Sequence, residues 1–457
     1  MTPDAPCWSS IEELAAGYRG RRLSPVEVTR ALLDRIGRVD GALRSYLAVL
    51  EPSALQEARE SEHRHLAGGP RGPLDGVPIS LKDLFDVAGV PTTAASPILR
   101  EAVAKEDSAV CGRLRAAGAV IAGKANMHEL AYGTTGVSPH VAPARNPWNV
   151  DHVAGGSSSG SAASVAAGLA FGSVGSETGA SVRRPAAFCG VVGFKPTYGR
   201  ISRRGMLPCA WSLDTVGVFA RTVGDVAILA AALADDDRRD DTWREGSVAR
   251  LRVGIPRAYL DDVEPEGREA FQAAVETLAR LGAEVRELDL PEVRFSAVAS
   301  TVIAGAESSA QHRRWLAERP GDLGADVRGR LYLGATISAA EYLLGQRARR
   351  LIAAALGRAL GQVDVLAAPT APGPAPRIAD GAAAIRDRGL EVGAHHTNLV
   401  RLPSLLGLPA ISVPCGWSRA GLPLGLQLFA RPFDETTILG VARAWELAMG
   451  PARRPTL

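Results

Sequence analysis

The sequence predicts an α/β fold, in which a β-sheet carries helices on both faces. Short apolar runs that are typical of strands alternate along the chain with longer segments of helical periodicity. Glycine accounts for 49 of the 457 residues, which indicates many tight turns between these elements. An apolar fraction of 46% excludes a disordered chain, and the length allows two or three domains or one large domain with insertions.

The first half of the chain alternates helices with short strands. Ser24-Pro25-Val26-Glu27 is a capping box with proline at the first helical position, and apolar residues follow it at helical spacing. A strand is predicted over 77–81, between a turn at Asp75-Gly76 and Lys82. The remaining elements predicted here are a helix over 108–117, a strand over 119–122 and helices over 161–169 and 222–233.

A charged connection precedes the second half. Residues 235–245 are rich in acids and arginines and are predicted to be solvated. A strand over 253–255, a helix over 266–281 and a strand over 284–290 are predicted after it, and together they suggest a βαβ unit. The elements predicted in the rest of the chain are a mainly helical region over 296–360, a proline-rich loop over 369–376, strands over 411–413 and 425–429 and a closing helix over 435–449.

Composition and charge exclude several functional classes. The net charge is +3 and the basic residues are scattered, so no direct nucleic-acid ligand is predicted. The five cysteines lie far apart without a CxxC pair, which argues against a disulfide framework or a zinc ribbon. The longest uncharged stretch, 153–176, consists mainly of Ser, Gly and Ala and predicts no membrane span. Without a visible signal peptide, a cytoplasmic protein is expected.

Lysine is rare in this arginine-rich chain, where 52 residues are basic. A lysine can lose its proton whereas an arginine cannot, so each lysine is a candidate base. Lys124 and Lys195 are predicted to be structural, and His395-His396 is predicted to be a surface pair because two ligands do not make a metal site. The sequence predicts no metal and no cofactor. The four lysines are Lys82, Lys105, Lys124 and Lys195.

Two stretches, 155–161 and 175–183, are rich in serine and glycine and admit three interpretations. The first is a phosphate cradle, in which a glycine loop that opens a helix presents backbone N–H groups to an anion. No GK[ST] motif follows either stretch. The spacing of Gly118, Gly123 and Lys124 mimics such a motif, but an alanine replaces the hydroxyl that would bind magnesium. Nucleotide binding is therefore disfavoured.

The second interpretation is the nucleophile elbow of an α/β-hydrolase. Residues 156–160 fit G-x-S-x-G with Ser158 at the centre. An elbow needs a buried strand immediately before it, and the segment 145–152 is polar and broken by a proline. The histidine of such a triad would have to come from His312, His395 or His396.

The third interpretation depends on a series of motifs around both stretches. In order along the chain these motifs are 75–83, 123–129, 145–148, 155–161, 178–183, 185–190, 193–197, 212–214, 407–410 and 421–427. On these motifs, over about 70–235 and 398–447, the sequence resembles the amidase signature family. The resemblance implies a mixed, mostly central β-sheet flanked by helices on both faces, with helical insertions. It divides the chain into an N-terminal helical segment 1–65, a catalytic core 66–235, a charged connection 236–250 and a remainder 251–457 of the same domain.

The resemblance also implies a Ser–cis-Ser–Lys triad. Ser181 takes the position of the nucleophile, Ser157 that of the bridging serine in a cis peptide with Gly156, and Lys82 that of the base. Ala180 stands where the family usually has glycine, while Glu177 replaces a commoner Asp and Ser159 a commoner Gly. The backbone N–H groups of the oxyanion hole would be those of Thr178, Gly179, Ala180 and Ser181.

Other residues receive weaker predictions. The candidates for substrate binding are Met127 and Tyr132, together with the variable region 296–400. Arg183 is expected to anchor its loop by pairing with Glu177, and Asp214 to be a turn residue rather than a catalytic acid.

The proposed base has a physical requirement. A serine hydroxyl is a weak nucleophile and needs a neighbouring base. A lysine amine serves only when it is neutral, so its pKa must fall from about 10.4 by about 3 units. Burial has this effect because desolvation penalises the ammonium. Lys82 ends an apolar strand, which is consistent with burial.

The predicted function is hydrolysis of a small-molecule amide through an acyl-enzyme, with esters or carbamates as further substrates. One alternative is the glutamine-hydrolysing subunit of a tRNA-dependent amidotransferase, which 326–347 resembles; another is a catalytically silent binding protein of the same fold. The segment 391–397 lacks the acidic motif associated with glutamine capture, which favours a free-standing amidase. No membrane partner is predicted, and homodimer formation stays open.

Overall fold

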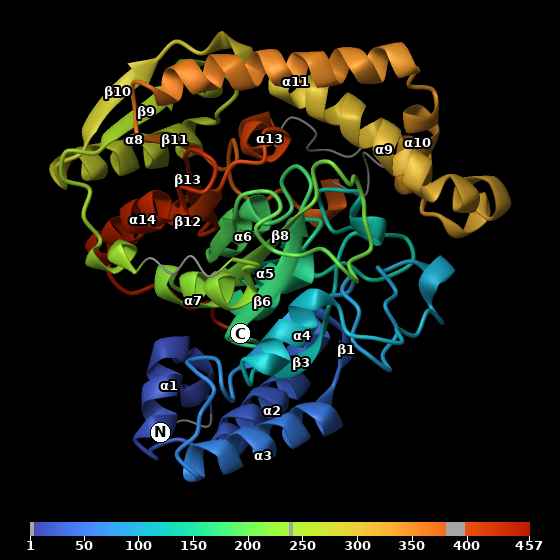
Figure 1. The fold of residues 1–457 in the computed structure, drawn as a ribbon, viewed down its shortest axis with the longest axis vertical. Helices are drawn as coiled ribbons and strands as arrows, with labels where there is room; N and C mark the ends of the chain where they lie inside the picture. Colours follow the sequence, from blue (N-terminus) through green and yellow to red (C-terminus); the bar gives the residue numbers. More distant parts are fainter. Residues whose placement is uncertain (1–3, 237–240, 381–397) are drawn as a thin grey trace.

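The computed structural model describes residues 4–236, 241–380 and 398–457. Eleven strands form one sheet, whose spatial order differs from the order along the chain (Figure 1). From one edge to the other they are β1 (Tyr46–Val49), β3 (Val120–Ala125), β2 (Pro78–Lys82), β6 (Gly172–Glu177), β8 (Thr215–Ala220), β7 (Val192–Lys195), β12 (Ala410–Trp417), β13 (Pro423–Phe429), β11 (Val365–Pro369), β9 (Arg252–Pro256) and β10 (Glu284–Leu288). A separate antiparallel pair consists of β4 (Arg145–Asn146) and β5 (Asn149–Val153).

Helices flank this sheet. They are α1 (Ile11–Arg19), α2 (Pro25–Leu43), α3 (Glu51–Leu66), α4 (Ala109–Ala116), α5 (Ser159–Ala166), α6 (Arg183–Cys189), α7 (Val223–Leu233), α8 (Pro265–Arg280), α9 (Ser296–Glu318), α10 (Ala325–Ala335), α11 (Ala339–Leu360), α13 (Asn398–Leu405) and α14 (Glu435–Met449). α5 and α6 pack against each other over the middle strands, and α7 packs against α4 and α14. β2 is parallel to β3 and β6 whereas β8 is antiparallel to β6 and β7, so the predicted α/β fold with a mixed central sheet is confirmed.

The elements that local patterns predicted are confirmed within a few residues at each end. Ser24 accepts hydrogen bonds from the N–H groups of Val26 and Glu27, and α2 begins at Pro25. β9 and β10 form the parallel pair of the predicted βαβ unit. β6 was not predicted, because its sequence Gly-Ser-Val-Gly-Ser-Glu lacks apolar residues in alternation. The strand is nevertheless buried along its whole length, with α5 and α7 packed on it. β1 lies within the segment 1–65 that was expected to be helical.

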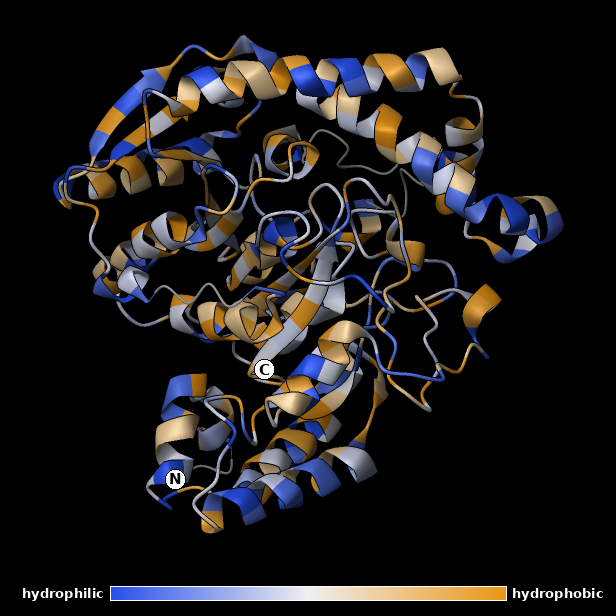
Figure 2. Cartoon of the chain, viewed as in Figure 1, coloured by the Kyte–Doolittle hydropathy of each residue, from blue (hydrophilic) through white to orange (hydrophobic). Residues whose placement is uncertain are grey.

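The main hydrophobic core lies between the sheet and the helices that pack on it. β2 and β3 are buried along their whole length, and Ile79, Leu81 and Ile121 belong to this core. Figure 2 shows the contrast with α2 and α3, where polar residues on the outside alternate with apolar ones. Burying one such aliphatic side chain stabilises the fold by about 1.5–3 kcal/mol. Because β2 is enclosed in this way, the lysine at its end is held away from water.

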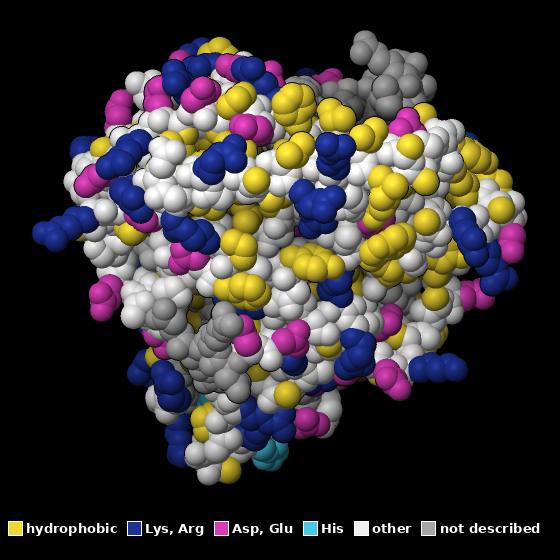
Figure 3. Space-filling view, turned by 45° about the horizontal axis from the view of Figure 1, so that its top comes forward, with side chains coloured by type: hydrophobic (Ala, Val, Ile, Leu, Met, Phe, Trp, Pro, Cys, Tyr) yellow, Lys and Arg dark blue, Asp and Glu magenta, His cyan; other side chains and the backbone are white. Residues whose placement is uncertain are grey.

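An outer layer of α9, α10 and α11 exposes many apolar side chains. Figure 3 shows this side of the molecule, where hydrophobic side chains are interspersed with arginines. No described helix is both long and apolar enough to cross a membrane. The large apolar side chains exposed on these three helices, and at the residue directly before α9, are Phe295, Val298, Tyr332, Leu333, Leu343, Leu344 and Leu351.

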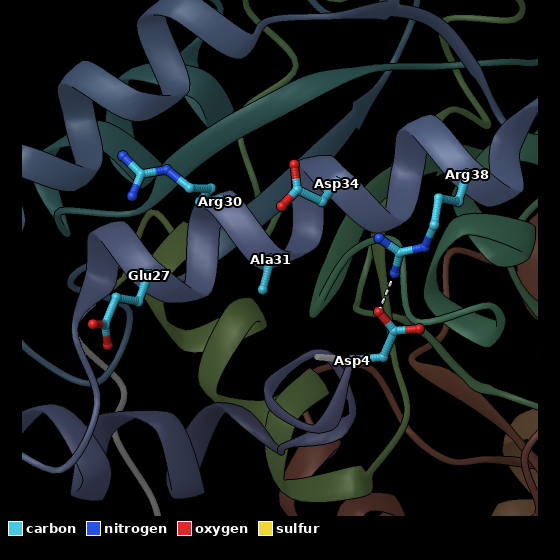
Figure 4. A pocket seen from close by; sticks show the side chains of 6 residues that line it. All are labelled: Asp4, Glu27, Arg30, Ala31, Asp34 and Arg38. Carbon is cyan, nitrogen blue, oxygen red and sulfur yellow. Dashed lines mark hydrogen bonds and ion pairs between the residues drawn. The ribbon is translucent and has the colours of Figure 1, made fainter. Parts of the chain in front are cut away.

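A surface hollow of about 230 Å³ lies over α2 (Figure 4). Asp4 at its rim forms ion pairs with Arg35 and Arg38, so the charge of Asp4 is already matched there. None of the predicted catalytic residues lines it. The lining residues are Asp4, Glu27, Arg30, Ala31, Asp34 and Arg38.

Candidate active site

Lys82 occupies the last position of β2, between β3 and β6, and is fully buried. Its Nζ donates to the Oγ of Ser157 at 2.6 Å and to the Oγ of Ser176, on β6, at 2.9 Å. Burial lowers the pKa of Lys82 to about 7, which is the shift that a lysine base requires. The structure thus brings together Lys82 and Ser157, which lie 75 residues apart in the sequence.

Ser157 lies in a glycine turn that precedes α5, and the Gly156–Ser157 peptide bond is cis. The carbonyl of Ser157 accepts a hydrogen bond from the backbone N–H of His128 at 3.0 Å. A Cβ added to Gly156 would lie 2.8 Å from the N of Gly136 and 3.2 Å from the O of Thr134. The neighbouring backbone therefore leaves room only for glycine at position 156.

Ser181 lies in the turn between β6 and α6. It is 6% exposed and Thr178, in the same turn, is 9% exposed, whereas Lys82 and Ser157 are 0% exposed. Ser181 and Thr178 therefore keep a small fraction of their surface open to solvent, while the predicted base and the predicted bridging serine are completely buried. This order suits a relay that moves a proton inward from the nucleophile.

Glu177 shapes the turn that holds Ser181. Its carboxylate accepts hydrogen bonds from the backbone N–H groups of Val182 and Arg183, each at 3.0 Å, and pairs with the Arg183 guanidinium. Burial favours a raised pKa at Glu177, but Arg183, Lys195 and a hydrogen bond from Ser404 lower it to about 2. The predicted pairing of Arg183 with Glu177 is confirmed.

Asp214 holds the start of the same turn. Its Oδ1 accepts from the hydroxyl of Thr178 at 2.6 Å, and its carboxylate also accepts from the N–H groups of Cys209 and Ala210. Burial raises the pKa of Asp214 to about 6. These contacts are those of a turn residue, as predicted. Asp214 also positions the hydroxyl of Thr178.

Tyr132 and Met127 lie in different surroundings. Met127 is buried in the main hydrophobic core. Tyr132 is half-buried, and a Cβ added to Gly305 of α9 would lie 3.8 Å from its hydroxyl oxygen. Burial raises the pKa of Tyr132 to about 12, although the nearby cations Arg330 and Arg401 lower it. Tyr132 thus faces the 296–400 region, which was predicted to shape the substrate site.

The remaining lysine and histidine predictions concern residues outside this centre. Lys124 pairs with buried Asp83 at 2.8 Å, and Lys195 donates to the carbonyls of Leu408 and Pro196, which are contacts of structural lysines. His312 stacks on Trp315 in α9. His395 and His396 lie outside the described residues.

The elbow interpretation finds no support in the contacts of Ser158. Its hydroxyl donates to the carbonyl of Ser176 at 3.2 Å. His312 has no hydrogen-bond partner among the described residues, and burial lowers its pKa to about 4. Sequence reasoning missed Ser176, His128 and Arg401, because each joins the site through the fold and none belongs to a pattern that predicts the contact.

Comparison with known proteins identifies the family. The model of the Amidase family matches residues 27–439, which include Lys82, Ser157 and Ser181. The chain belongs to the amidase family. It is therefore related to hydrolases that act on C–N bonds.

Three proteins show how far the similarity of this amidase-family chain extends. The A subunit of the glutamyl-tRNA(Gln) amidotransferase from Myxococcus xanthus is 40% identical, over 95% of this chain and 96% of that protein. A solved structure from a vestigial protein complex linked to the origins of an s-triazine catabolic enzyme is 33% identical, with a TM-score of 0.89 over 98% of this chain and 100% of that chain. The native peptide amidase of Stenotrophomonas maltophilia is 30% identical, with a TM-score of 0.84 over 99% of each chain.

Proposed function

We propose that the chain hydrolyses a carboxylic amide through an acyl-enzyme intermediate on Ser181. One observation carries the proposal: the buried Lys82 amine lies 2.6 Å from the Ser157 hydroxyl, and burial lowers its pKa to about 7. An amine with this pKa is largely neutral in mildly alkaline solution and can accept a proton.

In the proposed reaction, neutral Lys82 takes a proton from Ser157 while Ser157 takes one from Ser181. The Ser181 oxygen attacks the carbonyl carbon, and the N–H groups of the turn 178–181 stabilise the oxyanion. The proton returns through Ser157 to the leaving nitrogen as the C–N bond breaks. Water then attacks the resulting ester, giving up its proton to the same relay, and the carboxylic acid leaves.

A fluorophosphonate probe tests the nucleophile directly. We expect mass spectrometry to find the adduct on Ser181, and we expect Ser181→Ala and Lys82→Ala to prevent labelling. An adduct on Ser158 would overturn the proposal in favour of the elbow. No adduct on the folded protein, together with no turnover of any amide, would favour the silent binding protein.

The identity of the amide has two candidates, each supported by a different observation. The curated relatives at 40% identity are named as amidotransferase subunits, and they support the carboxamide of glutamine, with a partner protein, more strongly than a free-standing amidase. The absence of the acidic motif from 391–397 and the similarity to a peptide amidase support the free-standing enzyme. Both candidates use the same relay.

Assays of the purified chain separate the two. The panel is glutamine, neutral alkyl, aryl and peptide amides, and the matching esters and carbamates. Hydrolysis of the other amides of the panel, with no hydrolysis of glutamine, supports the free-standing amidase. Glutamine hydrolysis that rises when amidotransferase partner proteins are added supports the amidotransferase candidate.

The pH dependence of kcat/KM reports the proposed base. Lys82 must be neutral to act, so we expect kcat/KM to rise through an inflection near pH 7 and to fall about tenfold per pH unit below it. The measurement is a profile between pH 5.5 and 9. Asp214→Asn removes a neighbouring carboxyl whose pKa is about 6. Because the Asp214 carboxylate raises the pKa of Lys82, the inflection should persist in this variant and move to lower pH. A profile that is flat across pH 7 contradicts the role of Lys82.

His128 is expected to position Ser157. Its Nδ1 accepts from the N–H of Gly136 at 3.2 Å, so the ring hydrogen lies on Nε2, 3.0 Å from the carboxylate of Asp326 on α10. The segment around Gly136 packs against Gly156, so the His128 imidazole holds in place the backbone against which the Gly156–Ser157 turn packs.

Two variants of His128 separate its contacts. The amide oxygen of His128→Asn lies near the place of Nδ1 and can still accept from Gly136, whereas His128→Gln reaches only toward Asp326. We expect His128→Gln to lower kcat by about tenfold with little change in KM, and His128→Asn to retain more activity. If both variants lose the same fraction of kcat, and that loss parallels a fall in melting temperature, His128 has a purely structural role.

A further inference from the structure

The outward side of α11 exposes leucines at helical spacing. Leu343, Leu344 and Leu351 are 65%, 62% and 64% exposed. Ile352 and Leu356 face the other way and belong to the hydrophobic core beneath the helix. Leu344 and Leu351 are seven residues apart, so they lie on one side of α11, two turns and about 10 Å apart. α11 is therefore apolar on its outward side as well as on its buried side, and exposed apolar surface of this kind marks a contact site.

The neighbouring helix α9 extends this apolar surface. Val302 of α9 packs beside Gly345 of α11, and Tyr342 donates a hydrogen bond to Glu307, so the two helices run in opposite directions. Val298, one turn before Val302, is 66% exposed beside the middle of α11. Figure 3 shows hydrophobic and basic side chains gathered on this side of the molecule. We call the surface the α9–α11 face, and its residues are Val298, Leu343, Leu344, Arg347, Arg350 and Leu351.

Two arginines stand among the leucines of this face. Arg347 follows Leu344 by three residues and precedes Leu351 by four, so these side chains lie on the same side of α11. Arg350 directly precedes Leu351. Both arginines are exposed, and within the described chain neither has a hydrogen bond, an ion pair or a ring contact. The face thus combines apolar contact area with two guanidiniums that have no anionic partner.

The helices around the face have an excess of positive charge. α9, α10 and α11 contain eight arginines and four acids, an excess of four positive charges in a chain whose net charge is +3. Each of the four acids already binds another group of the chain. A second copy would bring the same positive excess to this face, so charge favours an acidic partner over a copy of the chain. The four acids are Glu307, Glu318, Asp326 and Glu341.

The order of side chains along α11 favours a protein helix over a membrane surface. A helix that lies on a membrane keeps its apolar side chains on one side and its basic side chains on the other. On α11 the guanidinium of Arg347 lies between Leu344 and Leu351 on the same side, so the leucines cannot enter the acyl layer without it. A partner helix meets both kinds of side chain, because it can place carboxylates opposite arginines and apolar groups opposite leucines.

We propose that the α9–α11 face binds an acidic amphipathic helix of a partner protein. The partner helix lies along α11, with apolar side chains at three- and four-residue spacing against Leu344 and Leu351. Its carboxylates pair with Arg347 and Arg350, and these charge-assisted hydrogen bonds fix its register. The interaction does not involve Ser181, so the proposal goes beyond amide hydrolysis and does not depend on it.

A designed peptide tests the chemistry of the face. The probe is a fluorescein-labelled peptide of four heptads with Leu at positions a and d and Glu at positions e and g; the comparison peptide has Lys at e and g. Anisotropy titrations with the full chain should show saturable binding of the acidic peptide, about tenfold tighter than that of the basic peptide, and weaker at high salt. No saturable binding of the acidic peptide, or equal binding of both peptides, overturns the proposal.

Variants of exposed residues locate the binding surface. Arg347→Glu/Arg350→Glu should weaken binding of the acidic peptide on the order of tenfold and strengthen binding of the basic one. Leu344→Gln/Leu351→Gln should weaken binding of the acidic peptide by a similar factor. The matched control is Arg30→Glu, at an exposed position on α2, which lies at the opposite end of the molecule from α11 (Figure 1) and should bind as wild type does. Wild-type affinity in either double variant overturns the proposal.

Two other occupants of the face give different results. Analytical ultracentrifugation of the chain alone detects a second copy: a dimer that Leu344→Gln/Leu351→Gln dissociates assigns the face to self-association. Co-sedimentation with phosphatidylserine/phosphatidylcholine vesicles detects a membrane: binding that Arg347→Glu/Arg350→Glu abolishes assigns the face to an anionic lipid surface. Either result overturns the proposal, whereas a monomer that ignores vesicles and binds the acidic peptide supports it.

Discussion

We expect Lys82→Arg to abolish amide hydrolysis in practice, with a loss in kcat of about 10²–10⁴-fold, the contribution of a positioned general base. The guanidinium keeps a positive charge at the end of β2 but stays protonated at every pH at which the protein is folded. It can therefore hydrogen-bond to Ser157 but cannot accept its proton. The measurement is kcat on the best amide of the panel, with labelling of Ser181 by the fluorophosphonate as a second readout.

The control for Lys82→Arg is the same substitution at another of the four lysines. Lys105 is exposed, and Lys105→Arg should keep full activity. Circular dichroism and the melting temperature show whether the larger side chain is tolerated in the buried site. If folded Lys82→Arg keeps more than a tenth of the wild-type kcat, the base is another group and the proposed relay is wrong.

Arg183→Ala produces the largest expected loss of stability. The Arg183 guanidinium is fully buried and donates to the side chain of Gln427 at 2.7 Å, the carbonyl of Val400 at 2.7 Å and the hydroxyl of Ser404 at 2.8 Å, besides pairing with Glu177. Its removal leaves the Glu177 carboxylate buried without its cation. Breaking a buried pair in this way costs about 3–5 kcal/mol.

A double-mutant cycle isolates the pair. Unfolding in urea gives the stability of wild type, Arg183→Ala, Glu177→Gln and the double variant. Because the double variant leaves no unpaired charge, we expect it to be less destabilised than the sum of the two single variants by more than about 1 kcal/mol. Simple additivity would mean that the two groups stabilise the fold independently. Arg183→Ala should also weaken labelling of Ser181, since the same carboxylate shapes that turn.

Much of the fold could be predicted from local patterns. Amphipathic spacing and the Ser24 cap located α2, and the apolar run before Lys82 located β2. β6 and β8 escaped prediction for a physical reason. Both strands are buried along their whole length, with α5 and α7 packed on them, and a strand buried on both faces needs no alternation; β6 is in addition built mainly from small residues. The order of strands in the sheet depends on which pairs form hydrogen bonds, and a single sequence contains no record of that pairing.

The sequence by itself determined which residue types were available for chemistry. Lys82, Ser157 and Ser181 stand in motifs whose glycines and serines predict tight turns, and in a chain with four lysines Lys82 is one of few candidate bases. The motif series also indicates the family.

Only the tertiary structure decided how these residues meet. Lys82 reaches Ser157 and Ser176 because β2 pairs with β6 and the turn before α5 closes over the end of both strands. Arg401 approaches Gly179 from more than 200 residues away along the chain. Contacts of this kind depend on packing between distant segments, and the pKa of a buried lysine depends on the same packing, because burial alone removes the water that would stabilise its charge.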